Sequence, residues 1–547
     1  MKMRMTNMKY FSELLDRLYF TYSHIEKKKL LLDYFNKTPD PDRGYALAII
    51  AGALQFRYFK RGVIYEIITQ EVDEVLFHLS YDYVGDLSET MSLIWPYPVI
   101  DNDKLPALHY VVEQLQHLDK SQIKLYVRSL LNHTNAKERW ALVKMATGEL
   151  RIGVSARFLK QVLAEFGGRD INEIEFIWHA LSPPYENLFA WLEGKASKPN
   201  TSNTIYFHPV MLSHPLSEEE LLQIDINEFL IEWKYDGIRV QVVSTPIGKA
   251  LFSRTGDNIS HSFPDVLDNI NSFGVFDGEL VIGYSQQIRS FNELQKRLNR
   301  KKPSKKLMQE SPGHIILYDI LMLGDKDLRQ LSFTERRERL EKWLQLNPST
   351  SFSLSPMMAA KNIEQLKNLR IDSNNHPFPN VEGIMLKRKN SIYIPGRPAG
   401  QWYKWKRDPF ILDAVLMYAQ RGQGKRSSYY SDYTFGLWQN GILLPIGKAY
   451  FGFTDEELYQ LDKWIRQHTL QKFGPVREVE KQLVFEIAFE GIQMSTRHKS
   501  GFALRFPRIN RVRWDKPAKE SDNIEALKKL YLSTQEKGIT ANTKKKL

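Results

Sequence analysis

The hydrophobic pattern of this chain changes its period once, near residues 193–204. Before that point, apolar residues recur at helical spacing in FSELLDRLYFTY, VDEVLFHL and RFLKQVLAEF. Residues 193–204 contain Pro, Ser and Asn and are typical of a linker. After them, strand-like runs dominate, among them FLIEWKYD, IRVQVVST and HIILYDILML. The sequence therefore predicts an all-α domain over 1–200 and an α+β domain over 205–409.

A second strand-rich segment follows Pro409 and begins with ILDAVLMYAQ. Within it, Asn440-Gly441 between two apolar runs is a strong signal for a β-hairpin. One helical stretch, TDEELYQLDKWIRQHTL, interrupts the strands. Short strands with a single helix predict a small β-barrel, such as an OB-fold domain, over 410–530. The polar, lysine-ended remainder, 531–547, is predicted to be a disordered basic tail.

The composition excludes several kinds of chemistry. The chain has 547 residues and no cysteine, which excludes disulfides, cysteine-ligated zinc, iron–sulfur clusters and a thiol nucleophile. Because there is no signal peptide and no run of 18 apolar residues, we expect a soluble, cytoplasmic protein without a membrane partner. The net charge is +12, and the basic excess lies toward the C-terminus, where residues 411–547 carry 23 basic and 15 acidic residues. This balance indicates a polyanionic partner.

The sharpest local signal is the segment EWKYDGIR, residues 232–239. An apolar strand leads to Lys234, Asp236-Gly237 turns the chain, and a second strand follows. A lysine is a nucleophile only when it is deprotonated, and burial or neighbouring cations such as Arg239 would lower its pKa. Taken alone, the pattern is also that of a hairpin with a solvated lysine.

Carboxylates and lysines with matching spacing follow downstream. FDGEL and VEGIM place Glu279 and Glu382 at apolar runs, and two such carboxylates can hold Mg²⁺. In WYKWK, Lys404 and Lys406 alternate, so both point to one face of a strand, where they would meet phosphate. The alternatives are ordinary turn carboxylates and a solvated strand face.

The segment RFPRINRVRWDK concentrates cations near the C-terminus. It holds four arginines and a lysine within twelve residues, and arginine is suited to bidentate contact with phosphate. Its apolar interleaving argues against disorder, although a solvated edge strand is the alternative. The cations are Arg505, Arg508, Arg511, Arg513 and Lys516.

Taken in order, these segments resemble the ATP-dependent DNA ligases of the covalent nucleotidyltransferase superfamily, over about residues 20–516. The matching segments are EWKYDGIR, FDGEL, LYDIL, VEGIMLKR, WYKWK and RFPRINRVRWDK. MATGELRIGV, preceded by GDLSET, resembles the DNA-binding domain of the larger three-domain ligases, and RHKSGFALRFPR is similar to bacterial members. The resemblance implies an enzyme that seals 5′-phosphate/3′-hydroxyl nicks in duplex DNA through a lysyl-AMP and a DNA-adenylate. It further implies roles in DNA repair, replication and recombination.

The resemblance also implies a role for each motif residue. Lys234 is the nucleophile that takes AMP, Glu232 lies where the family reads the adenine amine, and Tyr318 stacks on adenine. The residues implied to bind ATP are Glu232, Arg239, Arg254, Glu279, Tyr318, Lys404, Lys406, Arg505 and Lys516. Mg²⁺ or Mn²⁺ would be held by Glu279 and Glu382. The residues implied to contact phosphate or DNA are Arg508, Arg511, Arg513, Gly148, Arg151 and Gly153.

The helical domain must bind DNA without a net charge, since residues 1–200 carry 25 basic and 25 acidic residues. Bare backbone at Gly148 and Gly153 could approach phosphate directly. In addition, the spacing predicts a positive stripe on one face of the domain. Its members would be Lys137, Arg139, Lys144, Arg151, Arg157 and Lys160. The alternative is that these are ordinary solvated helix charges.

Three rivals remain beside the DNA ligase interpretation. An RNA ligase or an mRNA-capping guanylyltransferase shares the nucleotidyltransferase motifs, but the helical N-terminal domain and the RFPR segment favour a DNA ligase. A NAD-dependent ligase is disfavoured, because its zinc site needs cysteine and the chain has none. A non-catalytic nucleic-acid-binding relative would be expected to lack Lys234, which is present. We expect a monomer that acts with ATP on nicked double-stranded DNA, associated with the nucleoid when at work.

Overall fold

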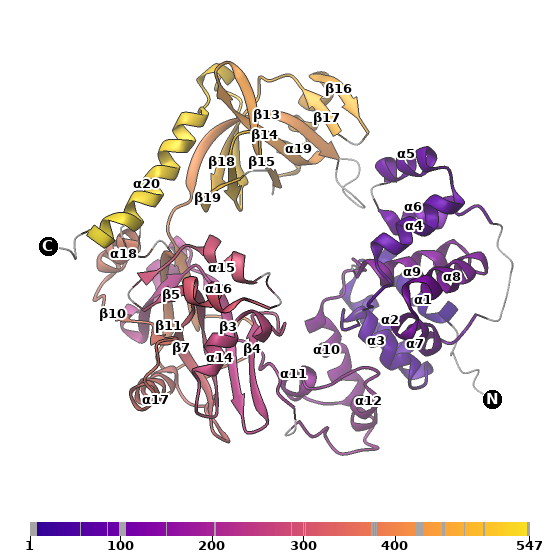
Figure 1. The fold of residues 1–547 in the computed structure, drawn as a ribbon, viewed down its shortest axis with the longest axis horizontal. Helices are drawn as coiled ribbons and strands as arrows, with labels where there is room; N and C mark the ends of the chain where they lie inside the picture. Colours follow the sequence, from indigo (N-terminus) through magenta and orange to yellow (C-terminus); the bar gives the residue numbers. More distant parts are fainter. Residues whose placement is uncertain are drawn as a thin grey trace. The chain divides into compact units, whose positions relative to one another are not determined.

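The computed structural model describes residues 8–543, apart from short gaps within that range. The gaps are 55, 85, 98–104, 149, 202–203, 286, 299, 301, 374–375, 377, 379, 422–429, 451–453, 475 and 496–497. The chain divides into two compact units (Figure 1). The first unit comprises residues 1–201, 419–431 and 455–478, and the second comprises residues 202–418, 432–454 and 479–547.

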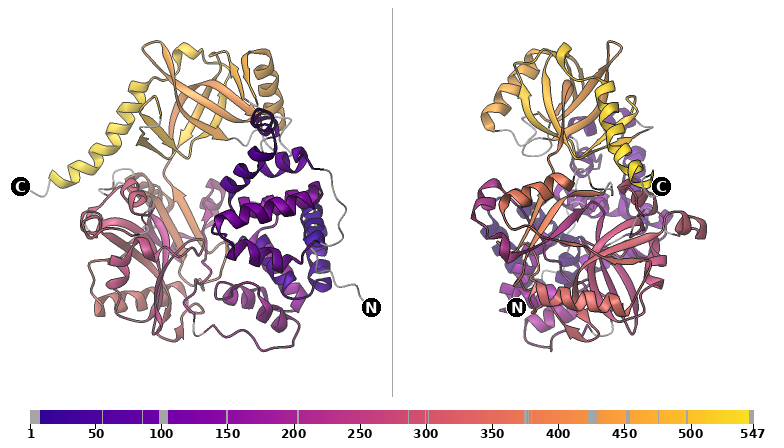
Figure 2. Two further views of the ribbon diagram at one scale, coloured as in Figure 1. Left: turned by 45° about the vertical axis from the view of Figure 1, so that its right-hand side comes forward. Right: turned by 90° about the vertical axis from the view of Figure 1, so that its left-hand side faces the viewer.

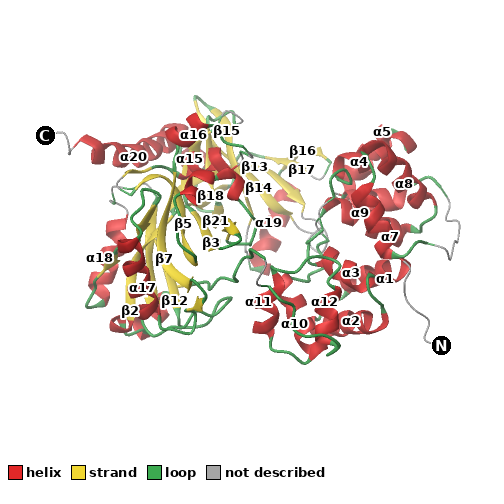
Figure 3. Cartoon of the chain, turned by 60° about the horizontal axis from the view of Figure 1, so that its bottom comes forward, coloured by secondary structure: helices red, strands yellow, loops and turns green. Residues whose placement is uncertain are grey.

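The N-terminal part of the first unit is built from helices that surround a single apolar core (Figure 3). Phe11, Phe35, Phe77 and Phe189 are fully buried there. The helices are α1 (Met8–Phe20), α2 (His24–Lys37), α3 (Asp42–Ile50), α4 (Arg61–Glu71), α5 (Glu74–Val84), α6 (Leu87–Ile94), α7 (Leu108–His117), α8 (Lys120–Asn132), α9 (Ala136–Thr147), α10 (Ala156–Gly167), α11 (Ile171–Trp178) and α12 (Glu186–Leu192).

Local sequence sets several of these helix ends. Asp119 and Asn135 form capping boxes with the third residues of α8 and α9, which satisfies free N–H groups at the helix starts. Gly148 ends α9 with φ of 72°, in the left-handed region that favours glycine. The helix α9 therefore ends at a glycine, which adopts this conformation without strain.

The larger part of the second unit consists of two sheets. Their strands follow the orders β4-β3-β5-β7-β8, with β6 on β5 and β9 on β7, and β1-β12-β11-β2-β10. The strands are β1 (His214–Pro215), β2 (Phe229–Tyr235), β3 (Ile238–Thr245), β4 (Gly248–Ser253), β5 (Gly274–Tyr284), β6 (Gln287–Ile288), β7 (Gly313–Leu323), β8 (Lys326–Asp327), β9 (Phe352–Leu354), β10 (Met357–Met358), β11 (Val381–Arg388) and β12 (Trp402–Lys406). The helices are α13 (Glu218–Gln223), α14 (Pro264–Asp268), α15 (Phe291–Leu298), α16 (Lys305–Glu310), α17 (Phe333–Leu346) and α18 (Ile363–Asp372).

The turn after Lys234 joins these two sheets. Strand β2 belongs to one sheet and β3 to the other, so the hairpin interpretation of this segment is wrong. Buried residues from both sheets, including Phe252, Leu321 and Trp402, pack in one cluster between them. As a result, Lys234 lies at the point where the chain crosses from one sheet to the other.

The C-terminal strands form a small barrel. The strand order β13-β14-β15-β21-β18 closes where β18 pairs with β13, and β15 and β21 are the parallel neighbours. This ring of five strands, with a helix between its third and fourth strands in chain order, is the arrangement of OB-like barrels. The elements are β13 (Phe410–Arg421), β14 (Tyr430–Gln439), β15 (Ile442–Tyr450), α19 (Asp455–Gln467), β16 (Thr469–Phe473), β17 (Val476–Val479), β18 (Val484–Phe489), β19 (Gly491–Met494), β20 (Phe502–Arg505) and β21 (Arg508–Arg513).

Two local predictions for this region have different outcomes. Asn440 and Gly441 form the tight turn between β14 and β15, with φ of 51° and 78°, so the predicted hairpin is confirmed. The predicted disordered tail is wrong over much of its length, because α20 (Ile524–Thr543) continues into it (Figure 2). Buried Ile524 and Leu527 fix the first turns of α20, and no proline interrupts the helix. None of the helices in the described residues is long and apolar enough to cross a membrane.

Candidate active site

A cavity of about 390 Å³ opens beside Lys234. Strand β2 supplies Lys234, its neighbour β11 supplies Glu382, and the opposite sheet supplies Glu279 from β5. The lining residues include every residue from Glu232 to Arg239, together with Arg254, Glu279, Tyr318, Glu382, Met385, Lys387, Arg397, Trp402 and Lys404. The structure thus brings most of the predicted nucleotide-binding residues into one cavity, although they are separated by up to 172 positions in the chain (404 − 232).

Lys234 lies among carboxylates. Its Nζ is 2.5 Å from Oε1 of Glu382. Burial by itself would lower the pKa of Lys234, but the charges of Glu382, Glu279 and Asp236 outweigh burial and raise that pKa above its ordinary value. The prediction that neighbouring cations lower this pKa is therefore wrong. The same lysine favours the ionised form of Glu382, whose pKa is lowered despite its burial.

Glu279 is the second carboxylate of the cavity, and it also orders the turn after Lys234. Its Oε1 accepts a hydrogen bond of 3.1 Å from the backbone N–H of Gly237. A side chain at Gly237 would collide with the carbonyl oxygen of Leu280 and would lie 2.9 Å from Cγ of Glu279, so only glycine fits here. Burial raises the pKa of Glu279 to about 7.

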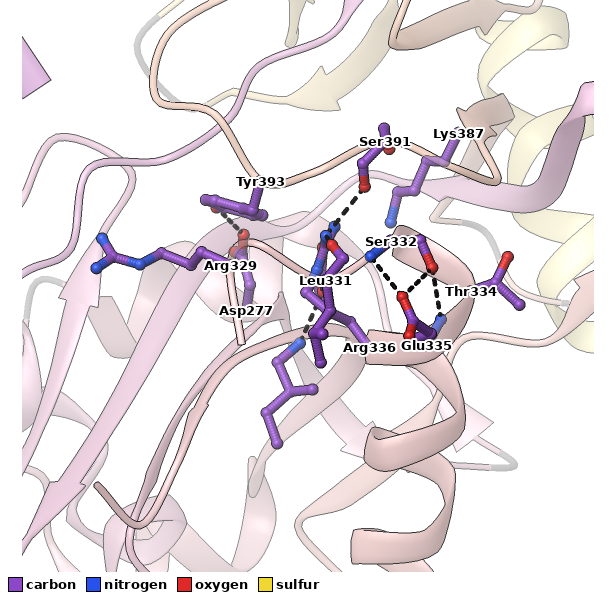
Figure 4. Close-up of polar contacts among 12 residues, drawn as sticks. Asp277, Arg329, Leu331, Ser332, Thr334, Glu335, Arg336, Lys387, Ser391 and Tyr393 are labelled. Atoms are coloured by element: carbon purple, nitrogen blue, oxygen red, sulfur yellow. Dashed lines mark hydrogen bonds and ion pairs between the residues drawn. The ribbon is translucent and has the colours of Figure 1, made fainter. Parts of the chain in front are cut away.

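Arg239 is fixed by partners that the sequence analysis did not identify. Its guanidinium forms a bidentate pair with Asp277 at 3.1 and 2.5 Å, and it donates to the carbonyl oxygen of Met211 at 2.6 Å. The Tyr393 hydroxyl donates to the same carboxylate at 2.6 Å (Figure 4). Asp277 lies two residues before Glu279 on β5, so strand alternation could have indicated that both face the site. No comparable local signal marks Tyr393.

The loop that carries Tyr393 is held in place from the start of α17. Arg336 donates to the carbonyl oxygens of Leu331 and Ser391 at 2.6 and 3.0 Å (Figure 4). Its guanidinium also forms a fully buried pair with Asp319 of β7, at 2.8 and 3.0 Å. These contacts fix the chain just before Tyr393, and therefore fix its hydroxyl against Asp277.

The end of the cavity near Tyr318 has a buried charge cluster. Lys387 Nζ lies 2.6 Å from Glu232 and 4.1 Å from the centre of the Tyr318 ring. Arg337 lies 3.2 Å from the other oxygen of Glu232, so both oxygens of this 1% exposed carboxylate have cationic partners. Lys387 is a cavity residue that the sequence analysis did not assign, although it belongs to the segment VEGIMLKR.

Cations line the other side of the cavity. Lys404, Arg254 and Arg397 belong to it, and only Arg397 is new relative to the sequence analysis. Burial lowers the pKa of Lys404, and the charges of Lys234 and Arg397 lower it further. Lys406 does not line the cavity, because it is paired with Glu490 at 2.9 Å and lies 3.4 Å from Glu382.

Of the cations in RFPRINRVRWDK, only Arg505 meets a cavity residue. Its Nη2 donates to Oδ1 of Asp236 at 2.8 Å, and its Nη1 donates to Oδ2 of the same carboxylate. Arg508 is half exposed and lies 3.9 Å from Glu490. The rest of the set is engaged within the barrel: Arg511 with Glu486, and Arg513 and Lys516 with Asp413.

The glycines predicted to meet DNA lie together in the first unit. Gly148, Arg151 and Gly153 line one open hollow between α9 and α10. Both glycines have positive φ, of 72° and 66°, and so does Arg151, at 51°. Lys27 donates from its Nζ to the carbonyl oxygen of Ile152 in the same loop. The space beside Gly148 is open, whereas the Lys27 side chain occupies the space where a Cβ of Gly153 would lie.

The predicted positive stripe in the first unit is wrong. Arg139, Lys144 and Lys160 are buried, with exposures of 4%, 3% and 7%. Arg139 donates to the carbonyl oxygens of Leu131 and Tyr97, Lys144 pairs with Asp86, and Lys160 pairs with Glu175. Sequence spacing could not separate these structural ion pairs from a DNA-facing surface, because both place cations on one helix face.

The candidate metal ligands are two glutamates. In the part of the chain that the structure describes, no three His, Asp or Glu side chains form a metal-binding group. Glu279 and Glu382 lie in the same cavity, and each raises the pKa of Lys234 through its charge. Two carboxylates of this kind can provide part of the oxygen shell that Mg²⁺ prefers, with phosphate and water as the remaining ligands.

Family models match three successive parts of the chain. Residues 7–164 match "DNA ligase N terminus", residues 210–406 match "ATP dependent DNA ligase domain", and residues 426–516 match "ATP dependent DNA ligase C terminal region". The middle match contains Lys234 and all the other residues of the cavity.

Curated proteins and solved structures give the same picture. A "Probable DNA ligase" of Koribacter versatilis is 33% identical over 456 residues, which is 78% of either chain. A "DNA ligase" of Thermococcus onnurineus is 27% identical and covers 96% of this chain and 98% of its own. The solved structure "Pmar-Lig_PreS3" has a similar fold, with a TM-score of 0.61 at 16% identity, over 92% of this chain and 99% of its own.

Proposed function

Because the chain belongs to the ATP-dependent DNA ligase family, we propose that Lys234 carries AMP from ATP to nicked DNA. Enzymes of this family seal nicks in DNA through an adenylate, and this is the reaction of the present chain. The observation that carries the assignment is the position of Lys234 in the cavity. Its Nζ lies 2.5 Å from Glu382, and Lys404, Arg254 and Arg397 line the same space. That arrangement suits a nucleophilic amine opposite an anionic triphosphate.

The first step is transfer of AMP from ATP to the enzyme. Nζ of Lys234 attacks the α-phosphorus, a phosphorus–nitrogen bond forms, and the bond to the pyrophosphate oxygen breaks. Lys404, Arg254 and Arg397 would neutralise charge on the phosphate oxygens as the bonds exchange. Before attack the amine must lose the proton that it shares with Oε1 of Glu382 at 2.5 Å.

Glu279 and Glu382 would hold a divalent cation, Mg²⁺ or Mn²⁺, through their carboxylate oxygens. Such an ion supplies positive charge to the phosphate oxygens during transfer. The raised pKa of Glu279 supports this role, because a buried carboxylate that lacks sufficient positive charge around it is stabilised by a cation.

The remaining steps take place on DNA. An oxygen of the 5′-phosphate at the nick attacks the phosphorus of lysyl-AMP, and Lys234 leaves as an amine. The 3′-hydroxyl then attacks the activated 5′-phosphate, a phosphodiester bond forms and AMP departs. Arg239 would orient the ribose and phosphates of AMP, since Asp277 and Met211 fix its guanidinium.

We further propose that three domains share this work, over residues 1–200, 205–409 and 410–530. The hollow at Gly148 and Gly153 would bind the DNA backbone, and the barrel would bring Arg505 to the nucleotide site. Arg508, which is half exposed, is a second candidate for phosphate contact from the barrel. We propose a monomer at work on nucleoid DNA.

Labelled ATP tests the function directly. The protein is incubated with α-labelled ATP, resolved by denaturing electrophoresis and then chased with a nicked duplex. We expect label on the chain that moves to the DNA as the nick is sealed. Parallel reactions with α-labelled GTP and with nicked RNA address the capping-enzyme and RNA-ligase rivals. A chain that takes label only from GTP, or that never passes label to DNA, would contradict the proposal.

A further inference from the structure

Basic residues are concentrated in one short part of the second unit that no step above uses. Residues 296–306, with the sequence KRLNRKKPSKK, contain seven Lys or Arg and no acidic residue. We call this stretch the basic segment. It connects the end of α15 to the start of α16. Its described cations other than buried Arg297 are all exposed: Lys296, Arg300, Lys302, Lys305 and Lys306.

Three of the described cations of the basic segment have acidic partners, among them buried Arg297, which pairs with Asp265 at 2.6 Å. Lys296 pairs with Glu293, and Lys306 lies 3.8 Å from Glu310. Among the residues that the structure describes, Arg300, Lys302 and Lys305 form no ion pair. Three neighbouring exposed cations without acidic partners repel one another, so an anionic ligand would stabilise the segment.

Hydrogen bonds fix the described part of the basic segment at Arg297, Leu298 and Arg300. Arg297 is fully buried and donates to the carbonyl oxygens of Ser262 and Ser311, at 2.7 and 2.8 Å. The Ser262 hydroxyl donates to the carbonyl oxygens of Leu298 and Arg300, at 3.1 and 3.0 Å. These bonds hold the segment at its beginning and just beyond its end. The exposed cations thus extend from a chain that is fixed at these residues. This lowers the conformational entropy that is lost when an extended partner binds.

Helix α15 connects the basic segment to the active site. The ring of Phe291, the first residue of α15, has its centre 4.1 Å from the guanidinium of Arg505, which in turn binds Asp236 in the cavity. Eight helical residues extend about 12 Å. At 3.4 Å per base pair, this distance corresponds to roughly four base pairs of duplex.

We propose that the basic segment binds the phosphate backbone of duplex DNA a few base pairs from the nick. The proposal rests on the DNA ligase function above, which requires duplex on both sides of the reacting phosphate. Arg300, Lys302 and Lys305 supply positive charge to phosphate oxygens, and contacts to phosphate carry no sequence information. It positions the duplex relative to Lys234 and takes no part in the chemistry.

The test is a triple variant, Arg300→Gln, Lys302→Gln and Lys305→Gln, measured against a control with the same charge change. The control is Lys326→Gln, Lys342→Gln and Lys367→Gln, which alters exposed lysines on β8, α17 and α18. Helix α17 lies at the other end of the sheets from α15 and α16 (Figure 1). Binding of a nicked duplex is measured as a function of salt, and self-adenylylation with α-labelled ATP is measured on the same preparations.

We expect the basic-segment variant to bind the nicked duplex about 10-fold more weakly or worse, with unchanged adenylylation. The slope of log K against log salt should become shallower by about 0.9 for each phosphate that the variant no longer binds, up to roughly 2.7 for three. The control should match the wild type in affinity and slope. Unchanged affinity in the basic-segment variant, or an equal loss of affinity in the control, would overturn the proposal. A wild-type protein that takes AMP but neither binds nor seals a nick would instead contradict the ligase function.

Discussion

At the scale of single residues, the surroundings of Lys234 decide how its amine becomes reactive. Glu382, Glu279 and Asp236 raise the pKa of Lys234, so the amine is protonated at neutral pH. A cation held by Glu279 and Glu382 would weaken their hold on that proton. On this account the resident arginines alone would not make the amine nucleophilic, because the carboxylates hold its proton.

The pKa of Glu279 predicts how stability depends on pH. In the unfolded chain this group releases its proton near its ordinary pKa of 4.5, whereas in the folded protein its pKa is about 7. The folded state therefore holds more protons between these values, so the stability contributed by protonated Glu279 is lost progressively as the pH rises from 4.5 to about 7. The loss should be on the order of 3 kcal/mol by pH 8.

Denaturant unfolding in the presence of a chelator measures this effect. The free energy of unfolding of the wild type should fall relative to that of Glu279→Gln between pH 5 and pH 8, because glutamine cannot ionise. A difference between the two proteins that stays constant across this range would contradict the buried environment assigned to Glu279.

The Tyr393 hydroxyl should matter for adenylylation although it lies behind Arg239. Tyr393→Phe removes the 2.6 Å hydrogen bond to Asp277 and leaves the ring in place. The expected cost is about 1 kcal/mol, which corresponds to roughly a five-fold loss in the rate of self-adenylylation. Rapid-mixing measurements with labelled ATP give this rate, and a rate equal to that of the wild type would show that Asp277 holds Arg239 without help.

At the scale of elements, strand periodicity in the sequence predicted much of the site. Lys404 lines the cavity from β12, and Glu279 lines it from the middle of β5, two residues after Asp277, as the period of two predicts. Asn440-Gly441 likewise predicted its turn from local chemistry alone. Where one strand determines the position of a side chain, the sequence was sufficient.

Contacts between distant elements could not be predicted in this way. The bond from Tyr393 to Asp277 joins positions 116 apart, and Lys144 reaches Asp86 across 58 positions. Burial of these groups depends on how helices and sheets pack, and a spacing rule contains no such information. The same limit explains why the cation stripe was wrong and why the carboxylates around Lys234 were not recognised as its dominant neighbours.

The turn between β2 and β3 should not tolerate a side chain. Gly237→Ala places Cβ against the carbonyl oxygen of Leu280, where a backbone atom cannot move aside cheaply. We expect a loss of about 1–3 kcal/mol in stability and a strong loss of adenylylation, because Lys234 is three residues away. Gly62→Ala in α4 is the matched control, since nothing lies within 4 Å of its added Cβ.

For the control, helix propensity predicts a stability that is unchanged or up to about 1 kcal/mol higher. Thermal unfolding and labelling with ATP compare the two variants. Equal behaviour of Gly237→Ala and Gly62→Ala would contradict the close approach at the turn.

At the scale of the whole molecule, basic side chains in different places have different partners. Residues 1–200 carry equal numbers of basic and acidic residues, and several of their cations stabilise the fold in buried pairs. The cations of the barrel also differ in the acidic residues that they contact. Arg505 extends to Asp236, whereas Lys516 and Arg513 hold Asp413 within the barrel. Similar side chains of one segment thus have different partners, one in the cavity and the others within the barrel.

This division predicts different outcomes for two alanine variants of the barrel. Arg505→Ala should slow self-adenylylation on the order of 10²–10³-fold, because a cation directed at the nucleotide site is removed. Lys516→Ala should leave that rate nearly unchanged and should lower stability by about 1–3 kcal/mol, because Asp413 loses a charge-assisted partner. Labelling kinetics and thermal unfolding measure both effects, and the reverse pattern would show that Lys516, rather than Arg505, serves the nucleotide.

The central claim is that AMP is carried on Lys234, and peptide mass spectrometry of the labelled protein tests it most directly. Wild-type protein and Lys234→Ala are incubated with ATP and a divalent cation, digested, and searched for an adenylylated residue. The account predicts AMP on Lys234 of the wild type, none on the variant, and sealing of a pre-adenylylated nick by both proteins. AMP on any other residue of the wild type, or near-stoichiometric adenylylation of Lys234→Ala, would contradict it.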